Sequence, residues 1–363
     1  MNTLKRSFAI ILCLLLTLTC LAGCHKKGEI AVTVGDVNFT SGYYACALVY
    51  ADTEARTLVE EQLSEQGQTP QEIKYWDYKV EETDYVTWVE NTAIKNLKKI
   101  AATKTLCAQV GVSTDAEDTS MAKTNVEYLW DTYGYSELMQ ENGVSKETFI
   151  QYMTDSYLAD KYFEYLYGKE GTKAISDEEL NKRLSENYVL VNIIEADFTS
   201  FSDENITETT AQFNSYKAML ESGTKTFEQI YLEYNKLSAE DHKHDEAAEG
   251  ELAPKDAHAT ILGNDTTDYY SDNYGEAKKM AVGDIKILTY AEKKGIALVV
   301  KKDIMADPYY IDFLDVNLRR EIVGDTFEND IMAFADSLAL DINTSSTKQF
   351  KVKKIHYPET VGY

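Results

Sequence analysis

Apolar runs bounded by turn residues divide the second half of the chain into a short series of predicted elements. Residues 188–198 form a largely apolar run, which is typical of a strand buried in a sheet. Residues 285–302 hold two β-rich runs around a turn-like segment at 292–295, which predicts a hairpin. Helical periodicity falls between these strands, with a long polar loop before the last helix, in residues 209–222, 226–234 and 274–280. Strands at both ends predict a compact inserted domain of about 115 residues.

The first half of the chain begins with a predicted hairpin and continues with helices. Residues 29–39 alternate around Gly35 and Asp36, and Thr40 or Ser41 can cap the helix that follows. Residues 62–83 are polar and predict a loop or a broken helix. The next helix is strongly periodic and stops before Gly111, with apolar positions at Val86, Val89, Ala93, Leu97, Ile100 and Cys107.

Further helices are marked by their starts and by their apolar faces. Residues 114–117 and 176–179 each have the pattern of a capping box. One helical face between them is predicted to carry Ile150, Met153, Tyr157, Leu158, Tyr162 and Tyr165. Two stripes follow the break at residues 307–308, made of Tyr310, Leu314, Leu318 and Ile322, then Phe327, Ile331, Phe334 and Leu338. Residues 350–355 are predicted to form a last strand.

The N-terminus has the features of a lipoprotein signal peptide. Lys5 and Arg6 precede an apolar run at residues 8–18, which is too short to span a membrane as a helix. Leu-Ala-Gly-Cys follows at residues 21–24 and matches the bacterial lipobox, so Cys24 is predicted to be lipidated and to anchor the protein on the outer face of the cytoplasmic membrane. The alternative is an ordinary secretory signal with a chance cysteine.

The chain is strongly acidic, which narrows the classes of partner. Its net charge is −25, and losing Lys5 and Arg6 with the signal peptide lowers this to about −27. Such a field repels nucleic acid and anionic lipid, and gives only a weak bias towards cationic unfolded chains. With 44% hydrophobic residues, the 363-residue chain can still fill two cores.

The sequence offers little metal or redox chemistry. Cys46 and Cys107 remain after processing, and we expect them to be small buried side chains, with a disulfide between them as the alternative. Histidines and carboxylates gather in the polar loop at residues 236–259, as Asp241, His242, His244, Asp245 and His258. Because no second ligand pair would fix a geometry, we expect no metal and no cofactor. No motif of a serine hydrolase, zinc protease or phosphate-binding loop is present in the sequence.

The inserted region resembles a parvulin-type peptidyl-prolyl isomerase domain. The order of strand, helices and strand pair is similar, as are Phe227 in its helix, the Gly-Glu-Leu turn at 250–252 and the Val-Gly-Asp-Ile turn at 282–285. The opening at residues 34–40 (VGDVNFT) and the helical joints resemble extracytoplasmic foldases of the PrsA and SurA type.

This resemblance implies an α+β fold with a split first domain. Residues 1–23 would be the signal peptide, and 24–187 and 307–363 would together build a helical SurA-like chaperone domain. Residues 188–306 would be the inserted parvulin-like α/β domain. The stripe from Phe327 to Leu338 is then expected to cover the helix at residues 86–107.

The resemblance also implies where an isomerase site would lie. The positions that match the two family histidines hold Asn192 and Ala297, so the polar network is predicted to be mostly lost. Phe227, Met280 and Tyr290 are candidates for an apolar seat of the proline ring, although each is also an ordinary core residue type. Catalysis of X-Pro isomerisation requires lowering a rotational barrier of about 18–20 kcal/mol, and it needs no nucleophile.

Three functions remain open at this level. The favoured one is a lipid-anchored chaperone that binds unfolded or nascent secreted polypeptides, for which the 26 tyrosines offer adaptable contact surface. The second is an active prolyl isomerase with a substituted network. The third is a solute-binding lipoprotein of a transporter, which would need repeated β-α units. Each of the three functions is compatible with a homodimer. The sequence does not identify which polypeptides a chaperone of this kind would bind.

Overall fold

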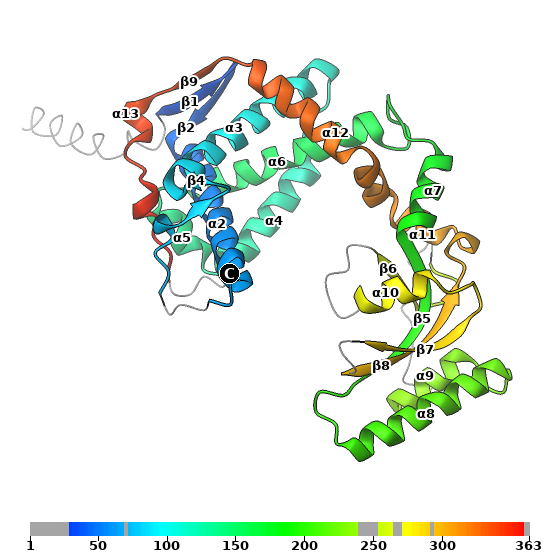
Figure 1. The fold of residues 1–363 in the computed structure, drawn as a ribbon. Helices are drawn as coiled ribbons and strands as arrows, with labels where there is room; N and C mark the ends of the chain where they lie inside the picture. Colours follow the sequence, from blue (N-terminus) through cyan, green and yellow to red (C-terminus); the bar gives the residue numbers. More distant parts are fainter. Residues whose placement is uncertain (1–28, 69–71, 239–252, 264–270, 291–293, 359–363) are drawn as a thin grey trace, which may run out of the picture. The chain divides into compact units, whose positions relative to one another are not determined.

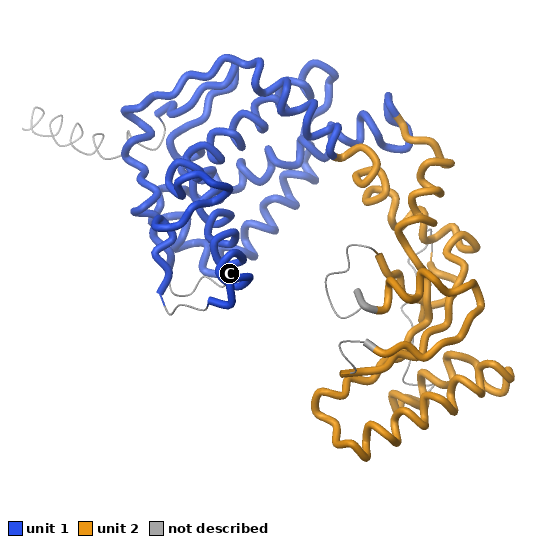
Figure 2. The backbone as a smooth tube through the Cα atoms, in the orientation of Figure 1, with its two compact units in different colours: residues 1–173, 325–363 blue, residues 174–324 orange. Residues whose placement is uncertain are grey.

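The computed structural model describes residues 29–68, 72–238, 253–263, 271–290 and 294–358, and it divides into two compact units (Figures 1 and 2). Unit 1 consists of residues 1–173 and 325–363, and unit 2 consists of residues 174–324. Both contain helices and sheet, so the fold is of the predicted α+β class. In the described part, no helix has the length and apolar character needed to span a bilayer. The assignment of the units to a chaperone domain and an isomerase-like domain stays a prediction.

A small sheet in unit 1 joins the two ends of the chain. β1 (Ile30–Val34) pairs with β2 (Val37–Thr40) through a turn at Gly35, whose φ of +57° suits glycine. The other side of β1 pairs with β9 (Leu340–Ile342), giving the antiparallel order β2-β1-β9. The C-terminal part of the chain therefore completes the N-terminal sheet.

The predicted strand at residues 350–355 is wrong. This segment contains the 3-10 turn η4 (Val352–Lys354), and the returning strand is β9, ten residues earlier. Val352 is buried, and Phe350 and Ile355 pack against the same core, so the apolar positions of the segment meet the helices without pairing as a strand.

Helices build the core of unit 1. Between α2 and α3 lie the short turn η1 (Tyr75–Asp77) and the two-stranded β3 (Lys79–Val80) and β4 (Thr83–Asp84). The helices are α2 (Ser41–Glu65), α3 (Tyr85–Val110), α4 (Ala116–Thr132), α5 (Tyr135–Glu141) and α6 (Lys146–Tyr167). Thr40 caps α2 by accepting from Tyr43 N at 3.3 Å, and α3 ends at Gly111 with a φ of +75°, both as the sequence predicts.

Two details of these helices differ from the sequence-based expectation. The N-cap of α4 is Asp115, because its carboxylate accepts from the backbone of residues 117 and 118, so the predicted box at 114–117 is one residue early. The buried positions of α6 are Phe149, Tyr152, Thr154, Asp155, Leu158, Phe163 and Tyr167, whereas Ile150 and Met153 are only partly buried. The error has a physical cause: α6 contacts the helices α2, α3, α4 and α5, so its buried face is wider than one stripe.

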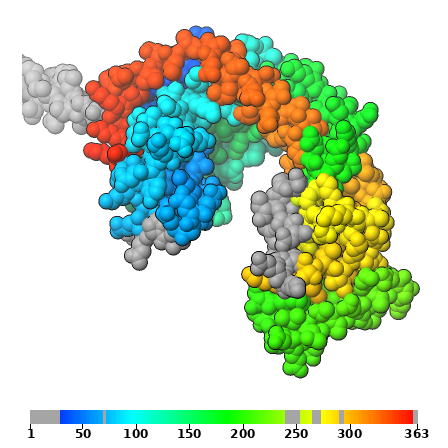
Figure 3. All heavy atoms as spheres, in the orientation of Figure 1, coloured from blue at the N-terminus to red at the C-terminus, as the bar shows by residue number. Residues whose placement is uncertain are grey.

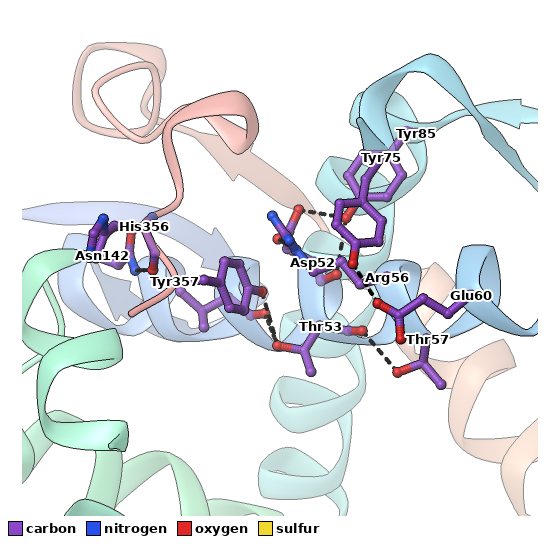
Figure 4. Close-up of polar contacts among 11 residues, drawn as sticks. Asp52, Thr53, Arg56, Thr57, Glu60, Tyr75, Tyr85, Asn142, His356 and Tyr357 are labelled. Atoms are coloured by element: carbon purple, nitrogen blue, oxygen red, sulfur yellow. Dashed lines mark hydrogen bonds and ion pairs between the residues drawn. The ribbon is translucent and has the colours of Figure 1, made fainter. Parts of the chain in front are cut away.

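A buried polar network fixes the C-terminal segment to α2 (Figure 4). Asp52 accepts hydrogen bonds from Arg56 Nε at 2.8 Å and from the Tyr85 hydroxyl at 2.9 Å. The Arg56 guanidinium lies over the rings of Tyr75 and Tyr357, 4.2 and 3.9 Å from their centroids. The contact of Arg56 with Tyr357 therefore ties the C-terminal segment to α2, across about 300 positions in sequence.

Helix α12 (Asp315–Ser337) carries the chain back into unit 1, where Figure 3 shows the C-terminal residues beside the N-terminal elements. Phe327 is buried against the rings of Tyr162, Phe163 and Tyr167 on α6. Lys98 and Lys99 of α3 form ion pairs with Asp336 and Glu328. Phe327 of the predicted stripe therefore lies against α6, and α12 contacts α3 through Glu328 and Asp336, which are not stripe residues.

Unit 2 is built on a four-stranded antiparallel sheet of order β6-β5-β8-β7. Its strands are β5 (Tyr188–Asp197), β6 (Ala259–Gly263), β7 (Ile285–Tyr290) and β8 (Gly295–Lys302). β6 lies in a stretch that the sequence analysis assigns to a polar loop, so it is missed there. Its helices and short turn are α7 (Asp177–Asn187), α8 (Asp203–Glu221), α9 (Phe227–Asn235), α10 (Ser271–Lys278), η3 (Ile304–Ala306) and α11 (Tyr309–Phe313).

The two faces of this sheet are covered by different helices (Figure 1). Odd-numbered residues of β5, such as Val189 and Val191, share a core with α10. Even-numbered residues contact α7 and α11 near Leu190, and α8 and α9 near Ile194. We call the face covered by α10 the odd face and the other face the even face. Asn192 is on the even face, between the core that includes Leu190 and the core that includes Ile194.

Candidate functional site

The two positions that match the family histidines lie on opposite faces of the unit 2 sheet. In the register of β5 and β8, Asn192 is paired with Val300, whereas Ala297 is paired with Glu195. Side chains alternate between faces along a strand, so Asn192 belongs to the even face and Ala297 to the odd face. Ala297 is fully buried in the core beside α10. These two residues therefore do not form one network.

Asn192 lines a pocket of about 630 Å³ on the even face of unit 2. Asn192 Nδ2 donates to Asp256 Oδ1 at 3.3 Å, and the other oxygen of Asp256 forms an ion pair with Lys302 at 2.8 Å. Although partial burial alone would raise it, hydrogen bonds from Lys302, Asn192 and the His258 backbone lower the pKa of Asp256. Asp256 is therefore a paired carboxylate that orients the Asn192 amide.

Two buried polar atoms in this pocket have no hydrogen-bond partner among the described residues. They are Asn192 Oδ1 and the hydroxyl oxygen of Tyr310, on residues that are 1% and 2% exposed. Burial, together with the nearby charges of Asp307 and Asp256, raises the pKa of Tyr310 to about 12, so its hydroxyl is neutral at physiological pH. The pocket thus offers one acceptor and one hydroxyl that can donate or accept.

The odd face carries a different polar pair, which the sequence analysis does not identify. Asn273 of α10 is buried, and its Nδ2 donates to Glu195 Oε1 at 2.7 Å. Burial raises the pKa of Glu195 to about 7, and the hydrogen bond from Asn273 opposes this only in part. Because the unfolded chain loses this proton near the ordinary value of 4.5, the carboxyl contributes stability that is present below that pH and is lost as pH rises towards 7.

The structure does not bring together the three residues predicted to form an apolar pocket for a proline ring, which are Phe227, Met280 and Tyr290. Phe227 is half-buried at the start of α9 and lines the even-face pocket with Asn192. Met280 is buried with Ala297 in the odd-face core. Tyr290 ends β7 opposite Gly295, and its side chain lies outside the described residues. Their role in a site stays a prediction.

Large apolar side chains are exposed on helices, turns and strands of unit 1 and on helices and turns of unit 2. Tyr128 is 58% exposed on α4, and its ring contacts that of Tyr133, with centroids 5.3 Å apart and hydroxyls at 3.2 Å. Other exposed large apolar residues of unit 1 are Ile30, Trp76, Val110, Met121, Leu340 and Ile342. Those of unit 2 are Phe201, Leu237, Val282, Met305, Phe313 and Val316.

The cysteine and histidine candidates have separate outcomes. Cys46 and Cys107 are both free thiols in the core of unit 1, as expected of small buried side chains. Cys24 and the loop residues Asp241, His242, His244 and Asp245 lie outside the described residues. In unit 1, one ligand atom each from Glu137, Glu141 and His356 lies within 4.8 Å of the others. All three residues are exposed, and the pair of His356 and Glu141 at 3.2 Å accounts for their proximity.

Strand parity is the signal that would have located Glu195 in the sequence. Glu195 is the only charged residue inside the apolar run at 188–196, and it shares the parity of Val189 and Val191, which predicts a half-buried carboxyl on the same face as they occupy. Asp256 and Lys302 carry no comparable signal, because they lie at the ends of a loop and a strand.

Comparison with known proteins gives matches in structure alone. No family model matches the chain, and no curated protein matches it. Foldase protein PrsA from Streptococcus pneumoniae is similar at 14% identity with a TM-score of 0.39, covering 71% of this chain and 90% of that one. Foldase protein PrsA from Lactococcus lactis is similar at 12% identity with a TM-score of 0.40, covering 89% of this chain and all of that one. The chain therefore resembles solved structures of PrsA foldases.

Proposed function

We propose that this chain is a lipid-anchored, extracytoplasmic foldase that acts mainly as a chaperone of secreted polypeptides. The observation that carries the proposal is the way the chain is divided: both ends build unit 1, and unit 2 is an insertion. Within unit 2 the order is strand, two helices, strand, helix and hairpin, which is compatible with a parvulin-like domain. The anchor would be the acylated Cys24.

A chaperone needs apolar contact surface that water can reach. The Tyr128–Tyr133 pair supports such a role in unit 1, because tyrosine rings combine a large apolar face with a polar tip. Exposed side chains on both units would give several weak contacts, and an unfolded chain could use them without a fixed sequence.

Prolyl isomerisation is the weaker part of the resemblance. The twisted amide of the transition state needs hydrogen-bond donors at fixed positions around it, and losing one such donor typically raises the barrier by a few kcal/mol. Asn192 and Ala297 lie on opposite faces, and the alanine side chain has no donor. This supports a site that is inactive in the manner of the family.

The chaperone proposal is tested by aggregation of a denatured reporter enzyme in the presence of the processed chain. We expect delayed aggregation, and we expect Tyr128→Ser with Tyr133→Ser to require roughly two- to tenfold more protein for the same delay, because each aromatic contact is worth about 0.5–1.5 kcal/mol. Glu127→Ser changes another exposed residue of α4 and is the control. Wild-type protein that leaves aggregation unchanged would refute the chaperone role.

One observation favours an active isomerase as the second candidate. Glu195 faces Ala297, is half-buried, and is held by Asn273, so a protonated carboxyl near neutral pH offers a donor beside the position of the lost histidine. Acceleration of X-Pro isomerisation in a model peptide at pH 6, abolished by Glu195→Ala, would establish this candidate. Isomerisation at the uncatalysed rate would exclude it.

The transporter alternative has less support. A solute-binding lipoprotein built on repeated β-α units would need parallel strands, and every strand pair in the described ranges is antiparallel.

A further inference from the structure

The even-face pocket of unit 2 has the features of a binding site that is separate from the face of Ala297. Its walls include the apolar side chains of Leu190 and Phe227, and its volume of about 630 Å³ is within the range of sites that hold small ligands. The pocket is formed by unit 2 alone, from β5, α9, the segment before β6, and the turn before α11.

The polar groups of the pocket define what it can bind. Asn192 uses Nδ2 on Asp256, and its buried Oδ1 has no donor among the residues that the structure describes. The buried Tyr310 hydroxyl has no partner in the same set of residues. A buried polar atom without a partner is costly, so a ligand that supplies one N–H and one carbonyl oxygen would be favoured here.

The charges of the pocket disfavour an anionic ligand. Asp256 is paired with Lys302, and Asp307 accepts from the backbone N–H groups of residues 255 and 309. Lys255 Nζ donates to the backbone oxygen of Ala306 at 2.6 Å. Glu228 and Asp303 add two more carboxylates to the lining, so the pocket disfavours an anion, whereas Asn192 and Tyr310 themselves carry no charge and favour a neutral polar group.

We propose that this pocket binds a peptide group of an extended, apolar polypeptide segment, with its N–H donating to Asn192 Oδ1 and its carbonyl oxygen accepting from the Tyr310 hydroxyl. The adjoining side chain of the segment would contact Leu190 and Phe227. The inference rests on the proposed function, since it gives the chaperone a specific place to hold its clients, and it assigns Asn192 to recognition of peptide backbone.

The test compares an amide with its ester. The probes are N-acetyl-leucyl-leucine N-methylamide and the depsipeptide in which the N–H between the two leucine units is replaced by oxygen. Binding to the processed chain is followed by NMR titration of the Leu190 and Ala257 methyl groups, which line the pocket. We expect the amide to bind roughly three- to tenfold more tightly, because the ester lacks the central N–H that is proposed to donate to Asn192 Oδ1, while the terminal N–H groups are the same in both probes.

Variants identify the atoms responsible. Asn192→Val, which is close in size, should remove the preference for the amide, whereas Asn214→Ala, a change at an exposed asparagine of α8, should retain it. If Asn192→Val does not fold, Tyr310→Phe removes the hydroxyl alone and should weaken both probes by a similar factor. Equal binding of amide and ester by the wild type, or an unchanged preference in Asn192→Val, would overturn the proposal. Tighter binding of N-acetyl-lysine N-methylamide than of the dileucine amide would also overturn it, in favour of a cation site.

The aggregation assay separates this inference from the proposed function. If the wild type suppresses aggregation but does not prefer the amide, the pocket assignment fails and the chaperone role stands. If the amide is preferred but aggregation is unchanged, the chaperone role fails and the peptide site stands as a small-peptide site.

Discussion

Replacing Phe327 by alanine tests whether the returning helix is part of the unit 1 core. Phe327 is 1% exposed, and its ring lies edge-on to Phe163, with centroids 5.2 Å apart, and near Tyr162 and Tyr167. Deleting a buried phenylalanine costs roughly 3–5 kcal/mol, because apolar burial is lost and a cavity remains. Since α6 is held by α3 and α4, it cannot readily move to fill the gap.

The expected loss is large relative to the stability of a domain, which is typically about 5–15 kcal/mol. For a unit of about 200 residues, each kcal/mol lowers the melting temperature by roughly 2–4 °C, so Phe327→Ala should lower the unit 1 transition by about 6–20 °C. Differential scanning calorimetry of the processed chain measures this shift. Tyr128→Ala removes an aromatic ring that is 58% exposed in the same unit, and should shift the transition by no more than about 2 °C.

A Phe327→Ala protein that melts within about 2 °C of the wild type would refute the split-domain reasoning. Loss of the same magnitude in Tyr128→Ala would refute it as well, since the effect would then not depend on burial.

Three other predictions concern single residues. Glu195→Gln should stabilise the protein at pH 8 by roughly 1–2 kcal/mol, after allowing for solvent screening of a half-buried group, because the raised pKa makes the buried carboxylate unfavourable there. It should have little effect at pH 4, where the carboxyl is protonated in the folded chain. Urea unfolding at both pH values measures the difference, and an equal effect at both would contradict the raised pKa. Tyr85→Phe should destabilise unit 1 by about 1–3 kcal/mol because buried Asp52 loses a donor, and Tyr133→Phe, on the surface, is its control in the same urea experiment. Cys24→Ala should release the protein from the membrane fraction, and an unmodified Cys24 in the mass spectrum of the wild type would contradict the lipobox interpretation.

The sequence predicts elements well where one local rule decides them. The hairpin at Gly35, the helix ending at Gly111 and the capping box at Ser176 are all present, because a glycine conformation or a cap is set by a few neighbouring residues. The segment with which a strand pairs can be far away in the sequence, and no local rule identifies it. Residues 340–342 give a weak strand signal, and only their pairing with β1 makes them the returning strand, whereas residues 350–355 alternate like a strand and form a turn.

The candidate site shows the same difference at the level of single side chains. Matching Asn192 and Ala297 to a motif treats them as partners, but the register of β5 and β8 decides which side chains share a face, and register depends on pairing across the sheet. Asn192 therefore meets Asp256 and Phe227 on one face, and Ala297 meets Glu195 on the other. The two faces of the sheet therefore offer different chemistry. One holds the pocket proposed to bind peptide groups, and the other holds a carboxyl whose pKa is raised to about 7. If the protein binds clients through the first, its binding should not follow the titration of the second, because the sheet and its apolar cores separate the two.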